Sequence, residues 1–211
     1  MMDISISQET VNRLYAILDG VADADKKVLK PALARGLSAA RAATVRETRK
    51  TYHISQTAFK NSALVRIRNV TQTGSGIIGS IQYSGRSIPL IRFNVTPKAP
   101  TFGKEAVTVS VKKTGSHVKL NHAFIAQMPT GHTGVFERKG RWVMSTRKNV
   151  KKETGNTMHN EKIKELLGPS VPSMAGNTDV MEKVETRVNE VINKRIKHEM
   201  ERLLGWNGGG L

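Results

Sequence analysis

The chain has 211 residues, and its 34 Lys and Arg against 17 Asp and Glu give a formal net charge of +17. Cysteine is absent, which excludes disulfides, cysteine nucleophiles and thiolate metal sites. No apolar run reaches the roughly 18 residues typical of a membrane span, and residues 1–10 lack the pattern of a secretory signal, so we expect neither. The charge predicts attraction to a polyanion, which could be nucleic acid, an anionic membrane face or an acidic protein.

Residues 1–60 are predicted to form helices. Apolar residues at helical spacing over residues 7–19 predict a first helix that ends at Gly20. In the second helix Pro31 marks either a kink or the start, and the Ala-rich stretch 32–43 allows close packing against a helix or a sheet. Its apolar stripe consists of Leu29, Leu33, Leu37, Ala40 and Thr44, and its second half is basic through Arg41, Arg46, Arg49 and Lys50. A short helix is expected at residues 55–60.

Residues 61–140 are predicted to form antiparallel strands. Alternating apolar residues, β-branched residues and glycine turn signals support this interpretation. The predicted strands are Ala63–Val70, Ile77–Tyr83, Ile88–Val95, Ala106–Lys112, Ala123–Met128 and Gly134–Glu137.

Residues 141–176 are predicted to be a basic loop and connector, and residues 177–205 a long C-terminal helix. Asp179 and Glu182 resemble a capping box, and Gly205 is expected to end the helix. The predicted buried stripe is Val180, Val184, Val188, Val191, Ile192, Ile196 and Leu203. The fold class is therefore α+β, with N-terminal helices, a central antiparallel sheet or sandwich and a long C-terminal helix, as one domain overall.

No motif that could carry catalysis survives a test of its structural context. Residues 74–79 match G-x-G-x-x-G, but a polar turn precedes them and an alternating strand follows, so we interpret them as a turn or bulge. His122 and His132 could converge if their strands pair, but no carboxylate is predicted to join them. Acidic residues between Asn61 and Lys152 are only Glu105 and Glu137, which argues against paired-carboxylate chemistry. We expect no enzyme activity, no cofactor and no metal.

Basic residues concentrate on the predicted late strands and the loop that follows them. This group could contact nucleic-acid phosphates or an acidic partner. It consists of Lys112, Lys113, Lys119, Arg138, Lys139, Arg141, Arg147, Lys148, Lys151 and Lys152. Aromatic residues among them are few, so contact with a nucleic acid would be with the backbone and independent of sequence.

Three segments carry a resemblance to one protein family. HAFIAQMPTGHTGVFERKG (His122–Gly140) and IKELLGPSVPSM (Ile163–Met174) resemble the minor tail protein Z family of lambda-like phages and prophages. PALARGLSAARAATVRETRK (Pro31–Lys50) is similar to the small-residue-rich helix of that family. The resemblance covers the first helices, the late strands and the C-terminal helix in the same order, whereas residues 70–115 are similar only in type.

The resemblance implies a structural protein of the tail or neck of a virion, a tail-completion protein made in the host cytoplasm. Such proteins usually form rings, so we expect contacts with further copies and with other tail or neck proteins, and no membrane partner. A ring around a DNA conduit would give the positive charge a use. The alternative is a free basic protein that binds nucleic acid without sequence preference. Residues expected to have structural roles are Phe124, Gly131, Gly134, Phe136, Gly168, Pro169 and Pro172, with turn geometry at the first two glycines and an extended connector fixed by the prolines.

Overall fold

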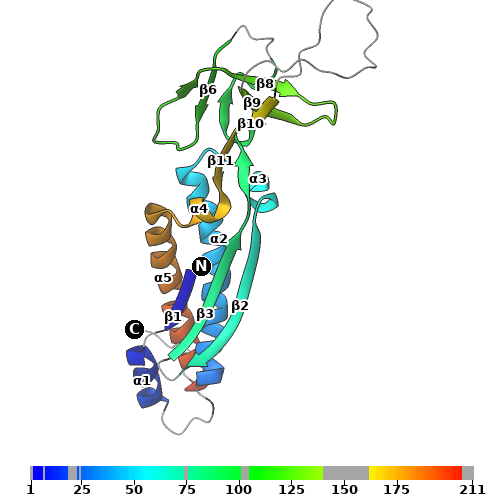
Figure 1. Ribbon diagram of the computed structural model, residues 1–211. Helices are drawn as coiled ribbons and strands as arrows, with labels where there is room; N and C mark the ends of the chain where they lie inside the picture. The colour runs from blue at the N-terminus through cyan, green and yellow to red at the C-terminus, as the bar shows by residue number, and fades with distance from the viewer. Residues whose placement is uncertain are drawn as a thin grey trace, which may run out of the picture. The chain divides into compact units, whose positions relative to one another are not determined.

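The computed structural model describes residues 2–6, 8–18, 23, 25–73, 76–100, 105–139 and 162–205. It contains helices and several antiparallel sheets and ends in a long helix, so the predicted α+β class is confirmed (Figure 1). The chain divides into two compact units, where one domain was predicted from the sequence. We call Met1–Thr51, Gln56–Arg86 and Ser170–Leu211 the helical unit, and Tyr52–Ser55 with Ser87–Pro169 the strand unit.

The helical unit combines helices from both ends of the chain with a three-stranded sheet. The sheet has the order β1-β3-β2, and both pairings are antiparallel. The elements are β1 (Met2–Ile6), α1 (Gln8–Ile17), the π-helical turn η1 (Asp25–Leu29), α2 (Lys30–Thr51), α3 (Gln56–Asn61), β2 (Leu64–Thr73), β3 (Gly76–Ser84), α4 (Val171–Ala175) and α5 (Thr178–Leu203). Strand β1 lies where only helices were predicted, and it is held by pairing with β3, which is far away in the sequence.

Helix α2 packs against both α5 and β3, and its small residues make this possible. The predicted stripe from Leu29 to Thr44 is buried throughout, and Pro31 is the second residue of the helix, so it marks the start. A Cβ at Gly79 of β3 would lie 2.8 Å from the Leu37 side chain. Ala32, Ala40 and Ala43 are buried, and a Cβ at Gly36 would lie 2.6 Å from Ile192 Cγ1 of α5, so the expectation of close packing by the Ala-rich stretch is confirmed.

Helix α5 begins slightly earlier than a cap at Asp179 would place it. The N-cap is Asn177, whose Oδ1 accepts a hydrogen bond from the Asp179 backbone N–H at 3.1 Å, so the predicted capping box is wrong. The buried residues Val180, Val184, Val188, Ile192 and Ile196 match the predicted stripe, while Val191 and Leu203 are partly exposed. The helix ends at Leu203, and Gly205 follows with a φ of +68°.

Residues 76–79 of the glycine-rich segment 74–79 lie in strand β3, where a turn or bulge was predicted, and β2 ends at Thr73 just before the segment. Thr73 pairs with Gly76, and β3 continues through Gly79 to Ser84. A dinucleotide fingerprint needs a helix at this point, because the helix N-terminus holds the pyrophosphate. The strand that follows agrees with the rejection of a nucleotide site, and residues 74 and 75 lie outside the described segments.

The strand unit contains two further three-stranded sheets and a short strand pair. The sheets have the orders β10-β9-β8 and β5-β6-β7, and β11 pairs with β4. The elements are β4 (Ser87–Pro89), the 3-10 turn η2 (Leu90–Arg92), β5 (Asn94–Thr96), β6 (Val107–Ser110), β7 (Val118–Leu120), β8 (Ala123–Gln127), β9 (Thr133–Lys139), β10 (Lys162–Glu165) and β11 (Leu167–Ser170).

Three predictions about the later chain need correction. The strand expected at Ile88–Val95 is interrupted by η2, whose turn is closed by the hydrogen bond from Phe93 N–H to the Leu90 carbonyl. The connector predicted to run to residue 176 instead forms β10, β11 and α4, with Pro169 in a strand and Pro172 in the first turn of α4. The predicted β region 61–140 is divided, since β2 and β3 belong to the helical unit.

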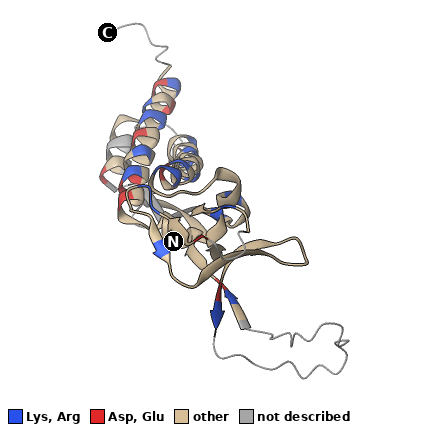
Figure 2. Ribbon diagram, turned by 90° about the horizontal axis from the view of Figure 1, so that it is seen from above, with Lys and Arg blue, Asp and Glu red and all other residues tan. Residues whose placement is uncertain are grey.

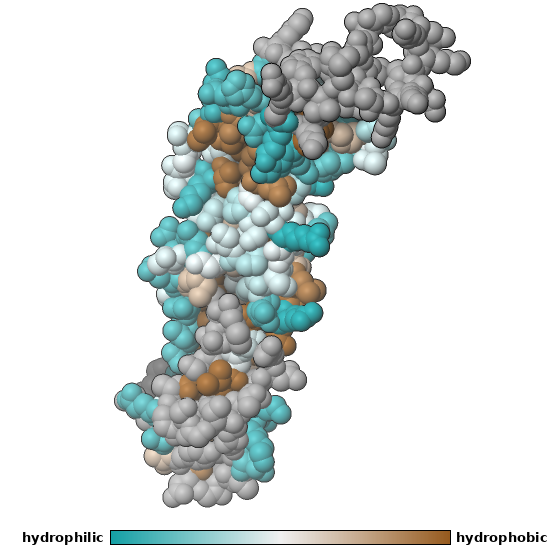
Figure 3. Space-filling view, viewed as in Figure 1, coloured by the Kyte–Doolittle hydropathy of each residue, from teal (hydrophilic) through white to brown (hydrophobic). Residues whose placement is uncertain are grey.

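Several large apolar side chains stay exposed. They are Ile17, Leu64, Ile67 and Leu204 in the helical unit and Val118, Ile163 and Leu167 in the strand unit. In Figure 3 hydrophobic residues on the visible face form separate patches among hydrophilic ones. Within the described residues, no helix has the length and apolar character needed to cross a membrane.

Candidate basic interface

The first resembling segment, His122–Gly140, contains the hairpin of β8 and β9. Phe124 pairs with Phe136 across the two strands, and their ring centroids are 6.1 Å apart. The turn is closed by hydrogen bonds from Met128 N–H to the His132 carbonyl and from Gly131 N–H to the Met128 carbonyl. Gly131 has a φ of +82°, as predicted, because this tight turn needs a left-handed residue.

Gly134 has a different role from the one predicted. It lies inside β9, is buried, and is not among the residues of positive φ. A Cβ at this position would lie 2.7 Å from Oε1 of Glu165 and 2.9 Å from the Phe136 ring. A larger residue would have to displace the Glu165 carboxylate and the Phe136 ring, so space rather than φ favours glycine here.

Glu165 reaches this position because β10 pairs with the other edge of β9. Its Oε1 lies 2.7 Å from Nε2 of His132, and the His132 ring meets the edge of the Phe136 ring at a centroid distance of 6.5 Å. No carboxylate was predicted for either histidine, since Glu165 lay in the predicted connector. The described residues hold no group of three or more His, Asp or Glu that could bind a metal ion.

Arg138 completes this face of the hairpin. Its guanidinium carbon lies 5.3 Å from the centroid of the Phe124 ring, a cation–π arrangement. Both residues line a hollow of about 940 Å³ along β8, together with His122. Gly168, the glycine of the second resembling segment, lies against a different ring, since its Cβ would stand 2.6 Å from Cε2 of Phe93. The residues of the two segments thus have packing roles.

The predicted basic residues are only partly brought together. Lys112 lies in an isolated bridge with Tyr52, Lys113 in the following turn, and Lys119 in β7 opposite Thr108. Arg138 and Lys139 lie in β9, in another sheet. All five are exposed. Arg141, Arg147, Lys148, Lys151 and Lys152 lie outside the described residues, so their placement stays a prediction.

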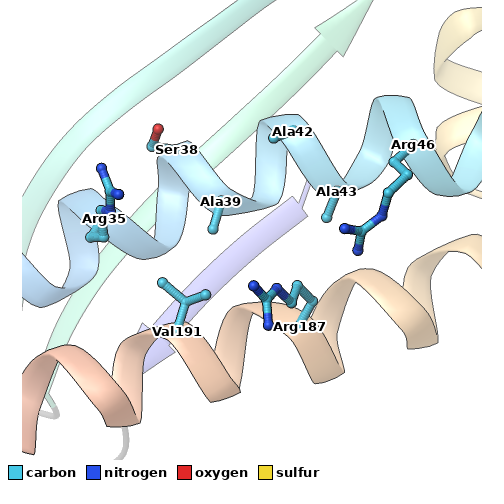
Figure 4. A pocket seen from close by; sticks show the side chains of 8 residues that line it. All are labelled: Arg35, Ser38, Ala39, Ala42, Ala43, Arg46, Arg187 and Val191. Carbon is cyan, nitrogen blue, oxygen red and sulfur yellow. The ribbon is translucent and has the colours of Figure 1, made fainter.

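The helical unit contains a basic surface, of which the sequence had indicated only the basic second half of α2. A groove of about 410 Å³ lies between α2 and α5, and Figure 4 shows its lining. Arg46 of α2 and Arg187 of α5 extend into the space between the helices from opposite sides. The lining residues are Arg35, Ser38, Ala39, Ala42, Ala43, Arg46, Arg187 and Val191.

A second hollow of about 480 Å³ lies along another flank of the same helix, beside α3. It shares Ser38, Ala42 and Arg46 with the groove, so the two hollows border one continuous strip of α2. The second hollow adds basic residues from α2 and α3, namely Arg41, Arg49 and Lys60. We call Arg35, Arg41, Arg46, Arg49, Lys60 and Arg187 the α2 basic surface, and all six residues are exposed.

The single acidic residue of α2 is Glu47, and it does not neutralise this surface. Its side chain is only 5% exposed, and its carboxylate accepts hydrogen bonds from Arg46 Nε at 2.8 Å and Lys50 Nζ at 3.0 Å. Burial alone would raise the pKa of Glu47, but the hydrogen bonds from Lys50 and Arg46 outweigh it, so the pKa lies below the ordinary value. One buried carboxylate therefore faces two cations, and the exposed side of α2 stays positive.

Part of the α2 basic surface could have been found from the sequence, and part could not. The helical period places Arg35, Ala42, Arg46 and Arg49 near one another, away from the buried leucine stripe. Arg187 comes from the far end of the chain, so only helix packing brings it to the groove.

Comparison of the chain with models of known protein families, with curated proteins and with solved structures finds no match in any of the three.

Proposed function

We propose that this protein is a non-enzymatic structural component of a tailed-phage virion, a minor tail or tail-completion protein at the tail or neck. The observation that carries the proposal is the segment His122–Gly140, which resembles the minor tail protein Z family. Its residues have the roles that a structural module requires. Gly131 forms the hairpin turn, Gly134 makes room for Phe136 and Glu165, and His132 binds Glu165.

Exposed apolar side chains support assembly with further subunits. Leu64 is 55% exposed, Val118 56% and Leu167 50%. Such residues are removed from water when subunits associate, and burying a side chain that is half exposed contributes about 1 kcal/mol before the costs of association. We propose that the partners are further copies of this chain in a ring and other tail or neck proteins, with phage DNA as a sequence-independent contact.

Mass spectrometry of purified particles tests the proposal. We expect peptides of this protein in density-gradient-purified virions, at a stoichiometry of a small ring rather than of the main tail tube. Cells that assemble phage without this gene should yield separate heads and tails that fail to join, or tails of abnormal length. Absence of the protein from particles that are complete and infectious would contradict the proposal.

The second candidate function is that of a free basic protein that binds nucleic acid. The α2 basic surface favours it, because six exposed cations gather there with no exposed acidic residue on α2. A free binding protein would be found in infected or induced cells on nucleic acid and not in purified particles. The same mass spectrometry therefore separates the two functions.

A further inference from the structure

We propose that the α2 basic surface is a contact surface for the phosphates of duplex DNA. This inference rests on the DNA contact proposed above and assigns that contact to a surface, but it does not depend on the ring or on the position in the particle. It also differs from the sequence-based expectation, which placed phosphate contacts on the late strands and the loop after them.

The spacing of the arginines suits a long polyanion. Arg49 follows Arg35 by 14 positions, which is about 21 Å along the axis at about 1.5 Å per residue. One strand of duplex DNA carries a phosphate about every 3.4 Å of helix axis, so α2 is long enough to meet several phosphates in succession. A small anion would occupy only one end of such a strip.

The residues between the arginines leave room for a close approach. Ser38, Ala39 and Ala42 are small, and hollows of about 410 and 480 Å³ lie beside them. A sugar–phosphate backbone could enter these hollows while guanidinium groups reach it from both sides. Arginine suits this contact, because its planar fork donates two parallel hydrogen bonds to phosphate oxygens.

Each of the two helices beside α2 contributes one cation to the lining of the hollows. Glu47 is buried beneath Arg46 and Lys50, so it does not face a ligand. On α5, Arg187 donates from Nη1 to Glu190 at 2.9 Å, and its remaining donors are available to the groove. Lys60 adds a cation from α3. A polyanion on this strip would therefore meet cations contributed by three helices.

A second copy of the chain fits this surface less well than DNA. In Figure 2 the helix that leads to the C-terminal end shows acidic positions interspersed with basic ones. On α5 those acidic residues include Glu190 and Glu201, each in an ion pair with a nearby cation of the same helix. Duplex DNA, in contrast, presents phosphates of one charge along its whole length, which matches a strip of arginines better than a helix of mixed charge does.

The test compares two charge-matched variants. In R35Q/R41Q/R49Q the α2 basic surface is reduced by three charges, while Arg46 and Lys50 remain as partners of Glu47. In K112Q/K113Q/K119Q the strand unit is reduced by the same number in its exposed turn and β7. Circular dichroism and thermal unfolding should show that both variants fold as the parent chain does.

Binding is measured by fluorescence anisotropy with a labelled short duplex of mixed sequence, at about 50 and 200 mM salt. We expect the parent chain to bind and the α2 variant to bind at least about 10-fold more weakly at the lower salt. Its salt dependence should be shallower, by up to about 0.9 log–log units for each phosphate that is no longer neutralised. The strand-unit variant should stay within about threefold of the parent, and AT-rich and GC-rich duplexes should bind alike.

Four outcomes would overturn the inference. They are absence of binding by the parent chain at about 50 mM salt, equal losses of affinity in the two variants, a larger loss in the strand-unit variant, or tighter binding of poly-glutamate than of DNA through the same arginines. The last result would assign the surface to an acidic protein partner. None of these results bears on whether the protein is found in virions, so failure of this inference is distinguishable from failure of the proposed function.

Discussion

Gly36 of α2 and Ile192 of α5 are in such close contact that a Cβ at position 36 would lie 2.6 Å from Ile192 Cγ1. Both residues are buried, and Val188 stands beside them. The two helices of the groove therefore approach at a position where one of them has no side chain. This contact sets how closely α2 and α5 pack, and with it the width of the basic groove.

Gly36→Ala is expected to destabilise the protein. Overpacking costs about 1–3 kcal/mol, and the better helix propensity of alanine offsets about 1 kcal/mol of it, so we expect a net decrease of up to about 2 kcal/mol in the free energy of unfolding. Urea unfolding followed by circular dichroism measures it. Ser38→Ala, on the exposed side of the same helix, serves as the control and should change stability by less than about 0.5 kcal/mol.

The Gly36 clash can be assigned to Ile192 by a double-mutant cycle. Ile192→Ala alone should cost about 2–5 kcal/mol, because it leaves a cavity. In the presence of Gly36→Ala the new methyl occupies part of that cavity, so the double variant should be more stable than the sum of the single changes by at least about 0.5 kcal/mol. Strict additivity would show that the two side chains do not compete for the same space.

Gly131→Ala should cost about 1–2 kcal/mol although the position is open. Nothing lies within 4 Å of the place that a Cβ would take, but φ is +82°, where a Cβ approaches its own backbone. Gly131→Asn should cost less, since asparagine tolerates this region. Thermal unfolding compares these with Gly115→Ala, a turn glycine whose φ is not positive, for which we expect little change. Equal effects at both glycines would contradict the conformational explanation.

Glu199→Gln should destabilise α5 at neutral pH and weaken the acid sensitivity of the protein. The carboxylate is 3% exposed and is bound by Arg202 Nε at 2.7 Å and by Arg195. The hydrogen bond from Arg202, partly opposed by burial, lowers the pKa of Glu199. A lowered folded-state pKa means that the stabilisation is present above the ordinary value of 4.5 and is lost as the pH falls through the folded-state value.

The Glu199 carboxylate is tested by urea unfolding at pH 7 and at steps below pH 4.5, the ordinary glutamate value. At pH 7 the Glu199→Gln variant should be about 1–3 kcal/mol less stable than the parent. This difference in the free energy of unfolding should become smaller as the pH is lowered. Glu201→Gln is the matched control, because that side chain is 43% exposed and lies 3.9 Å from Lys197. A gap that stays constant down to the acid transition would rule out this carboxylate as a source of acid sensitivity.

Thr48→Val should leave stability unchanged or raise it by up to about 1 kcal/mol. The Thr48 hydroxyl is buried and has no hydrogen-bond partner among the residues that the structure describes, so its removal relieves a desolvation cost. Thr44, one turn earlier and also buried, donates to the Ala40 carbonyl at 2.8 Å, and Thr44→Val should cost about 1 kcal/mol. Calorimetry on both variants checks the difference, and a larger decrease at Thr48 would reveal a partner of its hydroxyl.

The long helices were predictable from the sequence, and so were the short strands β6 and β8, while four other short strands were not. The buried stripes of α2 and α5 follow from a local period that the backbone dihedrals alone impose. Strands β1, β7, β10 and β11 have three to five residues each, too few for a period to be visible. Such strands form because a distant partner accepts their hydrogen bonds, as β3 does for β1.

The helix cap and the glycine roles show the same limit at the level of single residues. Asn177 and Asp179 are both good N-cap residues, and only the backbone conformation shows that Asn177 caps the N-terminus of α5. Gly131 and Gly134 lie in the same sequence motif, yet glycine is favoured at one by its φ and at the other by the closeness of the Glu165 carboxylate and the Phe136 ring. Glu165 lies on another strand, so the motif alone could not distinguish the two reasons.

By itself the sequence determined the α+β class, the buried faces of the long helices and the excess of positive charge. These properties depend on composition and on periods of a few residues. Only the tertiary structure decided which strands pair, that the β region is shared between two units, and that Arg187 lines a groove with Arg46. Each of these depends on contacts between residues far apart in the chain, which are selected by the packing of the whole fold and leave no local pattern.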